Sequence, residues 1–321
     1  MAHLVEQMAY VGATPWHGLG NQLSRHQAIN VWAEQAGMNW TIESSPVHFI
    51  ASGTSHMGEL LEHPDHKVLY RSDTQAPLSV VGHRYQVVQP EEILAFYNDL
   101  TEVSGFELET AGVLKGGRKL WALAKTGQTS VLKGNDRTNG YLLLATACDG
   151  SMATTAQFTS IRVVCNNTLA VALHGAKSSA TCVKVRHSSV FDAEKVKKAL
   201  GVSVSSWSQF MDQMKTLSNR KVRIKEAEDY FREVFFDPSS PNPDNNQKSM
   251  ARALELYDGQ GRGSDLASSR GMAYGLLNAV TEFVDHERRA HTTDNRLDSA
   301  WFGQGATIKQ KALDLAMDMV V

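Results

Sequence analysis

Lysine and arginine side chains gather in the middle of the chain, where acidic residues are scarce. Between Ala111 and Val190, ten basic residues stand against two acids, Asp136 and Asp149. These 80 residues carry a charge of +8, whereas the rest of the chain carries −10 and the whole chain −2. Clustered cations release counterions from a phosphate backbone, so a basic centre between acidic segments predicts an anion-binding surface. Solvated hairpins whose lysines only confer solubility are the alternative.

An aromatic ring accompanies two of these cations on one predicted strand. Alternation along residues 118–125 places Lys119, Trp121 and Lys125 on the same face. Cations beside a ring on which a base can stack, at about 1 to 3 kcal/mol per base, are typical of single-stranded nucleic-acid binding. The alternative places Trp121 in the core.

Further cations are expected in loops and on another strand. Arg137 lies in a predicted loop at 135–140, Arg162 follows a predicted hairpin, and Lys184 and Arg186 share a strand face. The planar donor fork of arginine suits phosphate, although Arg162 has a rival role as an anchor for the turn after it. The predicted nucleic-acid contacts are Lys115, Lys119, Trp121, Lys125, Lys133, Arg137, Arg162, Lys184 and Arg186.

Catalytic and cofactor signatures are missing from the sequence. There is no phosphate-binding loop and no dinucleotide-binding glycine pattern. His286 and His291 are five residues apart, so on a helix their rings diverge by about 140°. Cys165 lacks the local signature of a nucleophile paired with His187. We therefore expect no catalytic residue, no cofactor and no metal.

Histidines leave one alternative open. Seven of the twelve lie in the first 66 residues, and His63 and His66 flank Asp65 closely enough to hold a divalent ion. Surface loop histidines are the more ordinary interpretation.

Composition limits the class of protein. The 321 residues are 42% hydrophobic and 21% charged, with no apolar run of membrane-helix length and no signal peptide, which favours a soluble protein of the cytoplasm. Cys148, Cys165 and Cys182 are too few for a disulfide framework or a four-ligand zinc site. Length allows two domains, or one domain with an extension.

The elements that must position these residues are mainly antiparallel strands. Two-residue turns at Gly116-Gly117 and Asp149-Gly150 predict two hairpins. A helix is expected from Pro90 to Val103, because proline and two acids suit a first helical turn. A short helix is also expected after Asn166. The predicted strands are 67–71, 78–81, 85–89, 107–114, 118–125, 140–148, 151–159 and 181–187, after a short helix at 27–36.

From Phe191 onward the pattern becomes helical. Apolar residues from Trp207 to Leu217 recur on one helix face, followed by 230–235. Further helices are expected at 247–257, 270–289 and 306–319, with a second flexible stretch at 259–263. We predict an α+β protein, an antiparallel β-rich core with interposed helices and a helical C-terminal extension. The predicted divisions are a core at 1–190, a helical segment at 191–236, a linker at 237–247 and a helical subdomain at 248–321.

Several short stretches resemble a known family. They are ATPWHGLG (13–20), GHRYQVVQ (82–89), DGS (149–151), RVVCNNTL (162–169), TEFVDH (281–286), WFGQG (301–305) and KAL (311–313). They resemble the phage/plasmid-like family of bacterial, phage and plasmid proteins with an uncharacterised conserved domain, over nearly the whole chain. The resemblance implies a mobile-element protein and brings no catalytic residues.

The expected topology is also similar, at the level of fold, to the single-strand annealing recombinases of phages, which form rings or helices and pair strands without ATP. We therefore expect a non-enzymatic protein of the bacterial host cytoplasm that binds single-stranded nucleic acid, DNA in preference to RNA, and promotes annealing as a ring or helical homo-oligomer, without a membrane. One alternative is a metal-dependent nucleic-acid enzyme that uses the His-rich N-terminal segment. The other is a protein-binding module that contacts a host complex through its acidic helices.

Overall fold

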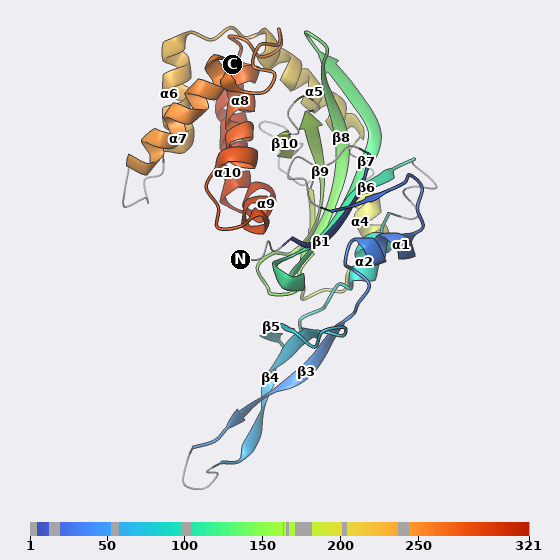
Figure 1. The fold of residues 1–321 in the computed structure, drawn as a ribbon. Helices are drawn as coiled ribbons and strands as arrows, with labels where there is room; N and C mark the ends of the chain where they lie inside the picture. The colour runs from blue at the N-terminus through green and yellow to red at the C-terminus, as the bar shows by residue number, and fades with distance from the viewer. Residues whose placement is uncertain are drawn as a thin grey trace. The chain divides into compact units, whose positions relative to one another are not determined.

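The computed structural model forms two compact units that interleave along the chain (Figure 1). It describes residues 5–12, 20–52, 58–97, 100, 105–162, 164, 167–170, 182–200, 204–236 and 244–320. Unit 1 comprises 1–124, 143–156 and 183–198, and unit 2 comprises 125–142, 157–182 and 199–321. The predicted divisions at 190, 236 and 247 stay a prediction.

Strands dominate the first half of the chain. Its elements are β1 (Val5–Val11), β2 (Asn21–Leu23), α1 (Ile29–Gln35), β3 (Ile42–Ile50), β4 (Leu60–Arg71), β5 (Pro77–Gly82), α2 (Pro90–Ala95), β6 (Glu107–Leu114), the 3₁₀ turn η1 (Lys115–Gly117), β7 (Lys119–Leu132), β8 (Asp136–Ala147), β9 (Thr154–Arg162), β10 (Asn167–Ala170) and β11 (Cys182–Val185). One sheet has the order β10-β9-β8-β7-β6-β1-β2, with β11 paired to β9, and a second has the order β3-β4-β5. β1 is parallel to β2 and antiparallel to β6.

Helices follow β11. They are α4 (Ala193–Leu200), α5 (Val204–Asn219), α6 (Ile224–Phe235), α7 (Asp244–Glu255), the π-helical turn η3 (Leu256–Gln260), α8 (Ala273–Glu282), a second π-helical turn η4 (Phe283–Glu287), α9 (Thr293–Phe302) and α10 (Gln304–Asp318). These elements confirm the α+β class with a helical C-terminal region.

The glycine turns position the hairpins. Gly116 and Gly117 both have positive φ, at 71° and 100°, which lets the chain reverse between β6 and β7. The connection is wider than the predicted two-residue turn, because β6 ends at Leu114 and β7 begins at Lys119. Around Gly150 the connection is wider than two residues, because β8 ends at Ala147 and β9 begins at Thr154.

Periodicity identified the core face of the helices. On α5 the side chains of Trp207, Phe210, Met211, Met214 and Leu217 are all buried, as their spacing predicts. Trp207 lies against Gly140 of β8, so this face of α5 covers one side of β8 within unit 2. The prediction of a helical face is confirmed.

Several local predictions differ from the structure. Residues 85–89 form no strand. They follow the end of β5 at Gly82, and the hydroxyl of Tyr85 donates a hydrogen bond to the carbonyl oxygen of Ala147. Residues 167–170 form β10 and not a helix, since they pair with the end of β9. Residues 171–181 and 237–243, which hold the rest of that helix and most of the predicted linker, lie outside the described residues.

Two helices, α2 and α9, also differ from the predictions. α2 begins at Pro90 with a capping box between Gln89 and Glu92 and ends at Ala95. Residues 98–99 and 101–104, which hold most of the rest of the predicted helix, lie outside the described residues. The helix α9 was not expected at all. It begins at Thr292, whose hydroxyl accepts a hydrogen bond from the backbone N–H of Asn295.

No helix in the described part of the chain combines the length and apolarity that crossing a bilayer requires. Cys148 is a buried free thiol, and Cys182 is half-buried. Cys165 lies outside the described residues.

Candidate nucleic-acid interface

The nine predicted contact residues are divided between the two units. Unit 1 holds Lys115, Lys119, Trp121, Lys184 and Arg186, and unit 2 holds Lys125, Lys133, Arg137 and Arg162. Each unit therefore has its own set of cations.

Lys119 and Trp121 are buried in unit 1, with 6% and 3% of their surface exposed. The strand β7 is buried on both faces from Lys119 to Ala124. The segment after α2 covers part of it, because Tyr97 donates its hydroxyl proton to the carbonyl oxygen of Ala122 at 2.9 Å. The two faces between which the side chains of β7 alternate are therefore both buried here, and neither Lys119 nor Trp121 lies on the surface. The core position of Trp121, which the sequence left open, is the one observed.

Arg162 is buried in unit 2 and forms an ion pair with Asp136. Its Nε donates to both carboxylate oxygens at 2.9 and 3.0 Å, and its Nη2 lies 2.6 Å from Oδ2. Nη2 also donates to Ser269 Oγ at 2.8 Å and to the carbonyl oxygen of Gly263 at 3.1 Å. The hydroxyl of Ser268 also donates a hydrogen bond to Oδ2 of Asp136, at 2.6 Å. The guanidinium is engaged by protein groups, which supports the anchoring role over a phosphate contact.

Hydrogen bonds to Arg162 and Glu282 hold residues 259–263, at the end of η3 and just after it. This glycine-containing stretch at 259–263 was expected to be flexible, but the backbone N–H of Arg262 donates to both carboxylate oxygens of Glu282, at 3.2 and 3.0 Å. Burial raises the pKa of the Glu282 carboxyl above its ordinary value. The stretch is thus bonded to β9 through Arg162 and to α8 through Glu282.

A second buried ion pair joins α10 to η4 and was missed from the sequence. Lys309 Nζ lies 2.7 Å from Asp285 Oδ1, and both side chains are 5% exposed. The ammonium group also donates to the carbonyl oxygen and the hydroxyl of Thr168. Lys309 shares a face of α10 with the buried Ala312, Leu313 and Ala316. A lysine at an apolar position of the helix was the available signal.

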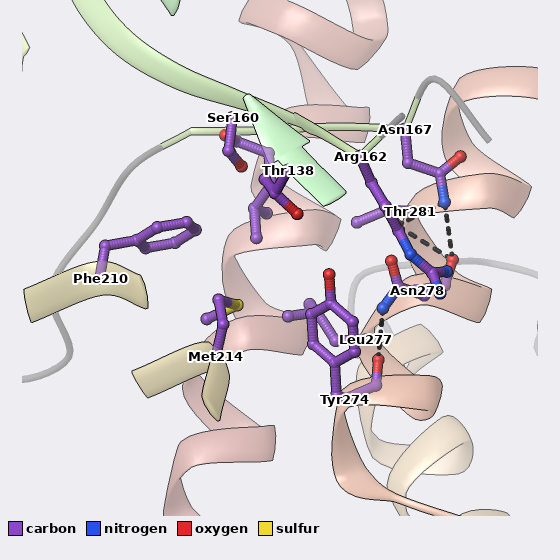
Figure 2. A pocket seen from close by; sticks show the side chains of 11 residues that line it. Thr138, Ser160, Arg162, Asn167, Phe210, Met214, Tyr274, Leu277, Asn278 and Thr281 are labelled. Atoms are coloured by element: carbon purple, nitrogen blue, oxygen red, sulfur yellow. Dashed lines mark hydrogen bonds between the residues drawn. The ribbon is translucent and has the colours of Figure 1, made fainter. Parts of the chain in front are cut away.

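Asn167 links β10 to α8 and η4. Its amide nitrogen donates to the carbonyl oxygen of Asn278 and to Thr281 Oγ1, and its Oδ1 lies 3.1 Å from His286 Nε2. Figure 2 shows Asn167, Arg162 and Asn278 beside a small cavity that Tyr274 and Phe210 also line. Its volume is about 20 Å³, which is of the size that a water molecule needs. The cavity does not have room for a nucleotide or a cofactor.

Two of the family-like stretches therefore meet in unit 2. Arg162, Asn167 and Thr168 come from 162–169, while 281–286 supplies their partners Thr281, Asp285 and His286. The backbone N–H of Thr168 donates to Asp285 Oδ2 at 2.7 Å. These polar groups satisfy one another, so we assign the stretches a structural role.

The predicted contacts of unit 2 that lie at its surface are on the β7–β8 hairpin. Lys133 and Arg137 are exposed and Lys125 is half-buried. Arg137 belongs to β8 and not to a loop, and the strand turns Asp136 and Thr138 inward and Arg137 outward. Asp136 is the only acid between residues 125 and 142, and it is buried. We call the surface formed by Lys125, Thr129, Val131, Lys133, Arg137 and Asn139 the outer hairpin face.

Polar and apolar groups complete the outer hairpin face. Thr129 donates its hydroxyl proton to Asn139 Oδ1 at 3.0 Å, and Val131 is 50% exposed. Lys133 donates to Asn219 Oδ1 at the end of α5. Because the amide is neutral, this hydrogen bond does not neutralise the charge of the ammonium group. The face combines three cations with no carboxylate.

In unit 1 both predicted cations at β11 are exposed, Lys184 within the strand and Arg186 directly after it. Val183 and Val185, beside and between them, are half-buried. Lys115 is half-buried in η1 with a φ of 54°.

Within the described ranges, no three His, Cys, Asp or Glu side chains come together in a metal-binding group. Both ring nitrogens of His187 lie near carbonyl oxygens, of Gln86 at 2.9 Å and Met152 at 3.2 Å, and its ring stacks on Tyr85.

Comparison with known proteins places these elements in a family. Residues 77–301 match the model of a domain of unknown function, DUF932, over more than half of the chain. The chain belongs to the DUF932 family. No curated protein and no solved structure matches it significantly. The DUF932 region contains the outer hairpin face and the Arg162–Asp136 pair, whereas β3, β4 and α10 lie outside it.

Proposed function

We propose that this DUF932 protein binds single-stranded DNA on the outer hairpin face and promotes annealing of complementary strands without ATP. The observation that carries the proposal is the set of three cations, Lys125, Lys133 and Arg137, on a face without a carboxylate. A phosphate backbone held there is attracted by three cations along the hairpin.

The hairpin suits an extended ligand. From Lys125 to Leu132 the strand β7 spans about 23 Å, which is long enough for several nucleotides. The inner side of β8 is held by the buried Asp136, so the outward cation Arg137 projects from a fixed backbone. Thr129 and Asn139 add neutral hydrogen-bonding groups between the charges.

Annealing requires no bond-making group. A protein that neutralises phosphates and leaves bases accessible lowers the repulsion between two complementary strands. A homo-oligomer would repeat the hairpin face along one strand. The exposed Lys184 and Arg186 are further cations, in unit 1. The family resemblance of the sequence supports a setting in phage or plasmid recombination in the host cytoplasm.

Fluorescence anisotropy with a labelled single-stranded oligonucleotide tests the binding. Three phosphate contacts predict a slope of about −2 in a plot of log affinity against log salt concentration. The triple variant Lys125→Ala, Lys133→Ala, Arg137→Ala removes these contacts and should remove most of that slope.

The matched control removes three exposed lysines from helices: Lys198→Ala, Lys225→Ala and Lys248→Ala. Both triple variants lower the net charge equally, so a general electrostatic effect would weaken binding in both. Binding by the control and not by the hairpin variant supports the proposal. Absence of wild-type binding at about 50 mM salt would end it. Strand pairing, followed by fluorescence energy transfer between two labelled complementary strands, tests the annealing step in the same variants.

A further inference from the structure

The long ribbon formed by β3 and β4 contains an irregularity that the proposed function does not use (Figure 1). Pairing is regular from Ile42 opposite Arg71 to Pro46 opposite Lys67. It then shifts, so that Val47 lies opposite His63. Residues 64–66 have no partner on β3 and form a bulge in β4. Bulges of this kind redirect side chains and are frequent beside functional sites.

The bulge brings two imidazole rings together. In a regular strand, residues three apart point to opposite faces and lie about 10 Å apart along the chain. Here His63 Nδ1 and His66 Nδ1 are 3.4 Å apart, with ring centroids 4.7 Å apart and ring planes at 83°. The backbone holds this arrangement, because the carbonyl oxygen of Asp65 accepts a hydrogen bond from the N–H of His83 at 2.8 Å.

The separation of the two nitrogens matches a shared ligand. Zinc binds histidine nitrogen at about 2.0 to 2.1 Å in tetrahedral geometry, so two such nitrogens on one ion lie about 3.3 to 3.4 Å apart. A direct hydrogen bond between the rings would be weak at the observed 3.4 Å. The backbone N–H of Asp65 also approaches His63 Nδ1, at 3.2 Å, which is likewise a long contact that a metal ion would displace.

The charged residues of the segment 62–66 itself are acidic. Glu62 precedes His63 and Asp65 precedes His66 in the sequence, and both acids are exposed, as is Arg84 next to His83. The nearest basic residue along β4, Lys67, turns its ammonium group to the carbonyl oxygen of Tyr85 at 3.0 Å. Within the described residues no third His, Cys, Asp or Glu side chain joins the pair, so water would fill the remaining positions.

We propose that His63 and His66 bind one divalent transition-metal ion of the zinc class through their Nδ1 atoms. Imidazole suits Zn²⁺, Ni²⁺ and Cu²⁺ better than Mg²⁺ or Ca²⁺. Two protein ligands make a weaker site than the four of a structural zinc centre, and bound metal would fix the bulge of β4.

Calorimetric titration of the full chain with zinc chloride tests the site. The wild type should bind one more equivalent than His63→Ala and His66→Ala, which should be alike. His48→Ala is the matched control, because His48 is exposed on the same ribbon but pairs with Glu62, outside the bulge. This control should bind zinc as the wild type does.

Electron paramagnetic resonance with Cu²⁺ gives a second readout that does not depend on the heat of binding. The wild type and His48→Ala should show coupling to two imidazole nitrogens, and both bulge variants should lose it. Equal stoichiometry in the wild type and His63→Ala overturns the proposal, as does loss in only one of the two bulge variants. Circular dichroism of each variant identifies any change in folding.

Discussion

Arg162 and Asp136, 26 residues apart in the chain, meet in the interior of unit 2 with Nη2 2.6 Å from Oδ2. Their side chains are 4% and 0% exposed. The pair connects the end of β9 to the start of β8, and through Ser268 and Ser269 to the segment before α8. A buried charge pair is costly to desolvate, so its hydrogen bonds must all be made for it to be tolerated.

Removal of one partner should therefore destabilise unit 2 strongly. Asp136→Ala leaves a buried guanidinium without its carboxylate, and we expect a loss of about 3 to 5 kcal/mol in the free energy of unfolding. The double variant Asp136→Leu, Arg162→Met should lose less than Asp136→Ala alone, because no buried charge remains. Urea denaturation measures both. A double variant as unstable as the single one would contradict this account.

Stability should also depend on Glu282 and pH. Burial raises the pKa of this carboxyl above its ordinary 4.5, so the folded protein holds the proton to higher pH than the unfolded chain. The contribution of Glu282 is thus fully present below pH 4.5 and is lost as pH rises through the folded pKa. In urea unfolding between about pH 4 and pH 8, Glu282→Gln should gain stability relative to the wild type as pH rises. A difference that is constant with pH would refute it.

Packing between α5 and β8 gives a third prediction. A Cβ at Gly140 would lie 3.0 Å from Thr126 Oγ1 and 3.1 Å from the ring of Trp207. Gly140→Ala should cost about 1 to 3 kcal/mol, because the well-packed ring must shift. Gly82→Ala is the control, since its nearest neighbour is 4.0 Å away and its φ is not positive. Thermal unfolding compares the two, and equal midpoints would show that Trp207 moves freely.

The cysteines should differ in reactivity. Burial raises the pKa of the Cys148 thiol to about 12, and the residue is 3% exposed, whereas Cys182 is half-buried. Since the thiolate is the reactive form, iodoacetamide at about pH 8 should label Cys182 well before Cys148. Peptide mass spectrometry follows each site, with urea-unfolded protein as the reference in which both react. Rapid labelling of native Cys148 would contradict its burial.

Local patterns in the sequence were sufficient for the elements that local physics determines. Glycine pairs located the β6–β7 reversal, and the spacing from Trp207 to Leu217 located the buried face of α5. The helix α9 escaped because its signal is a single cap at Thr292 ahead of a largely polar sequence.

Long-range burial could not be predicted in the same way. Alternation along β7 says which residues share a face but not that both faces are covered, so Lys119 was expected at the surface and the position of Trp121 was left open. The partner of Arg162 lies 26 residues earlier and leaves no periodic trace. Arg137 was expected in a loop, but it lies on β8 with its side chain outward, on the face opposite to that of Asp136. The strand begins at Asp136, earlier than the sequence indicated.

The interleaving of the two units has a consequence for synthesis on the ribosome. The chain passes from one unit to the other at residues 124, 142, 156, 182 and 198, each time inside a strand or helix. The nascent chain therefore cannot complete unit 1 until Lys198 has emerged, long after β1 has left the exit tunnel. Strands β1 to β5 find their strand partners before residue 115, but unit 1 still waits for residues 143–156 and 183–198. An incomplete unit exposes apolar surface for longer, which makes co-translational assistance by chaperones more valuable here than in a protein whose domains follow one another.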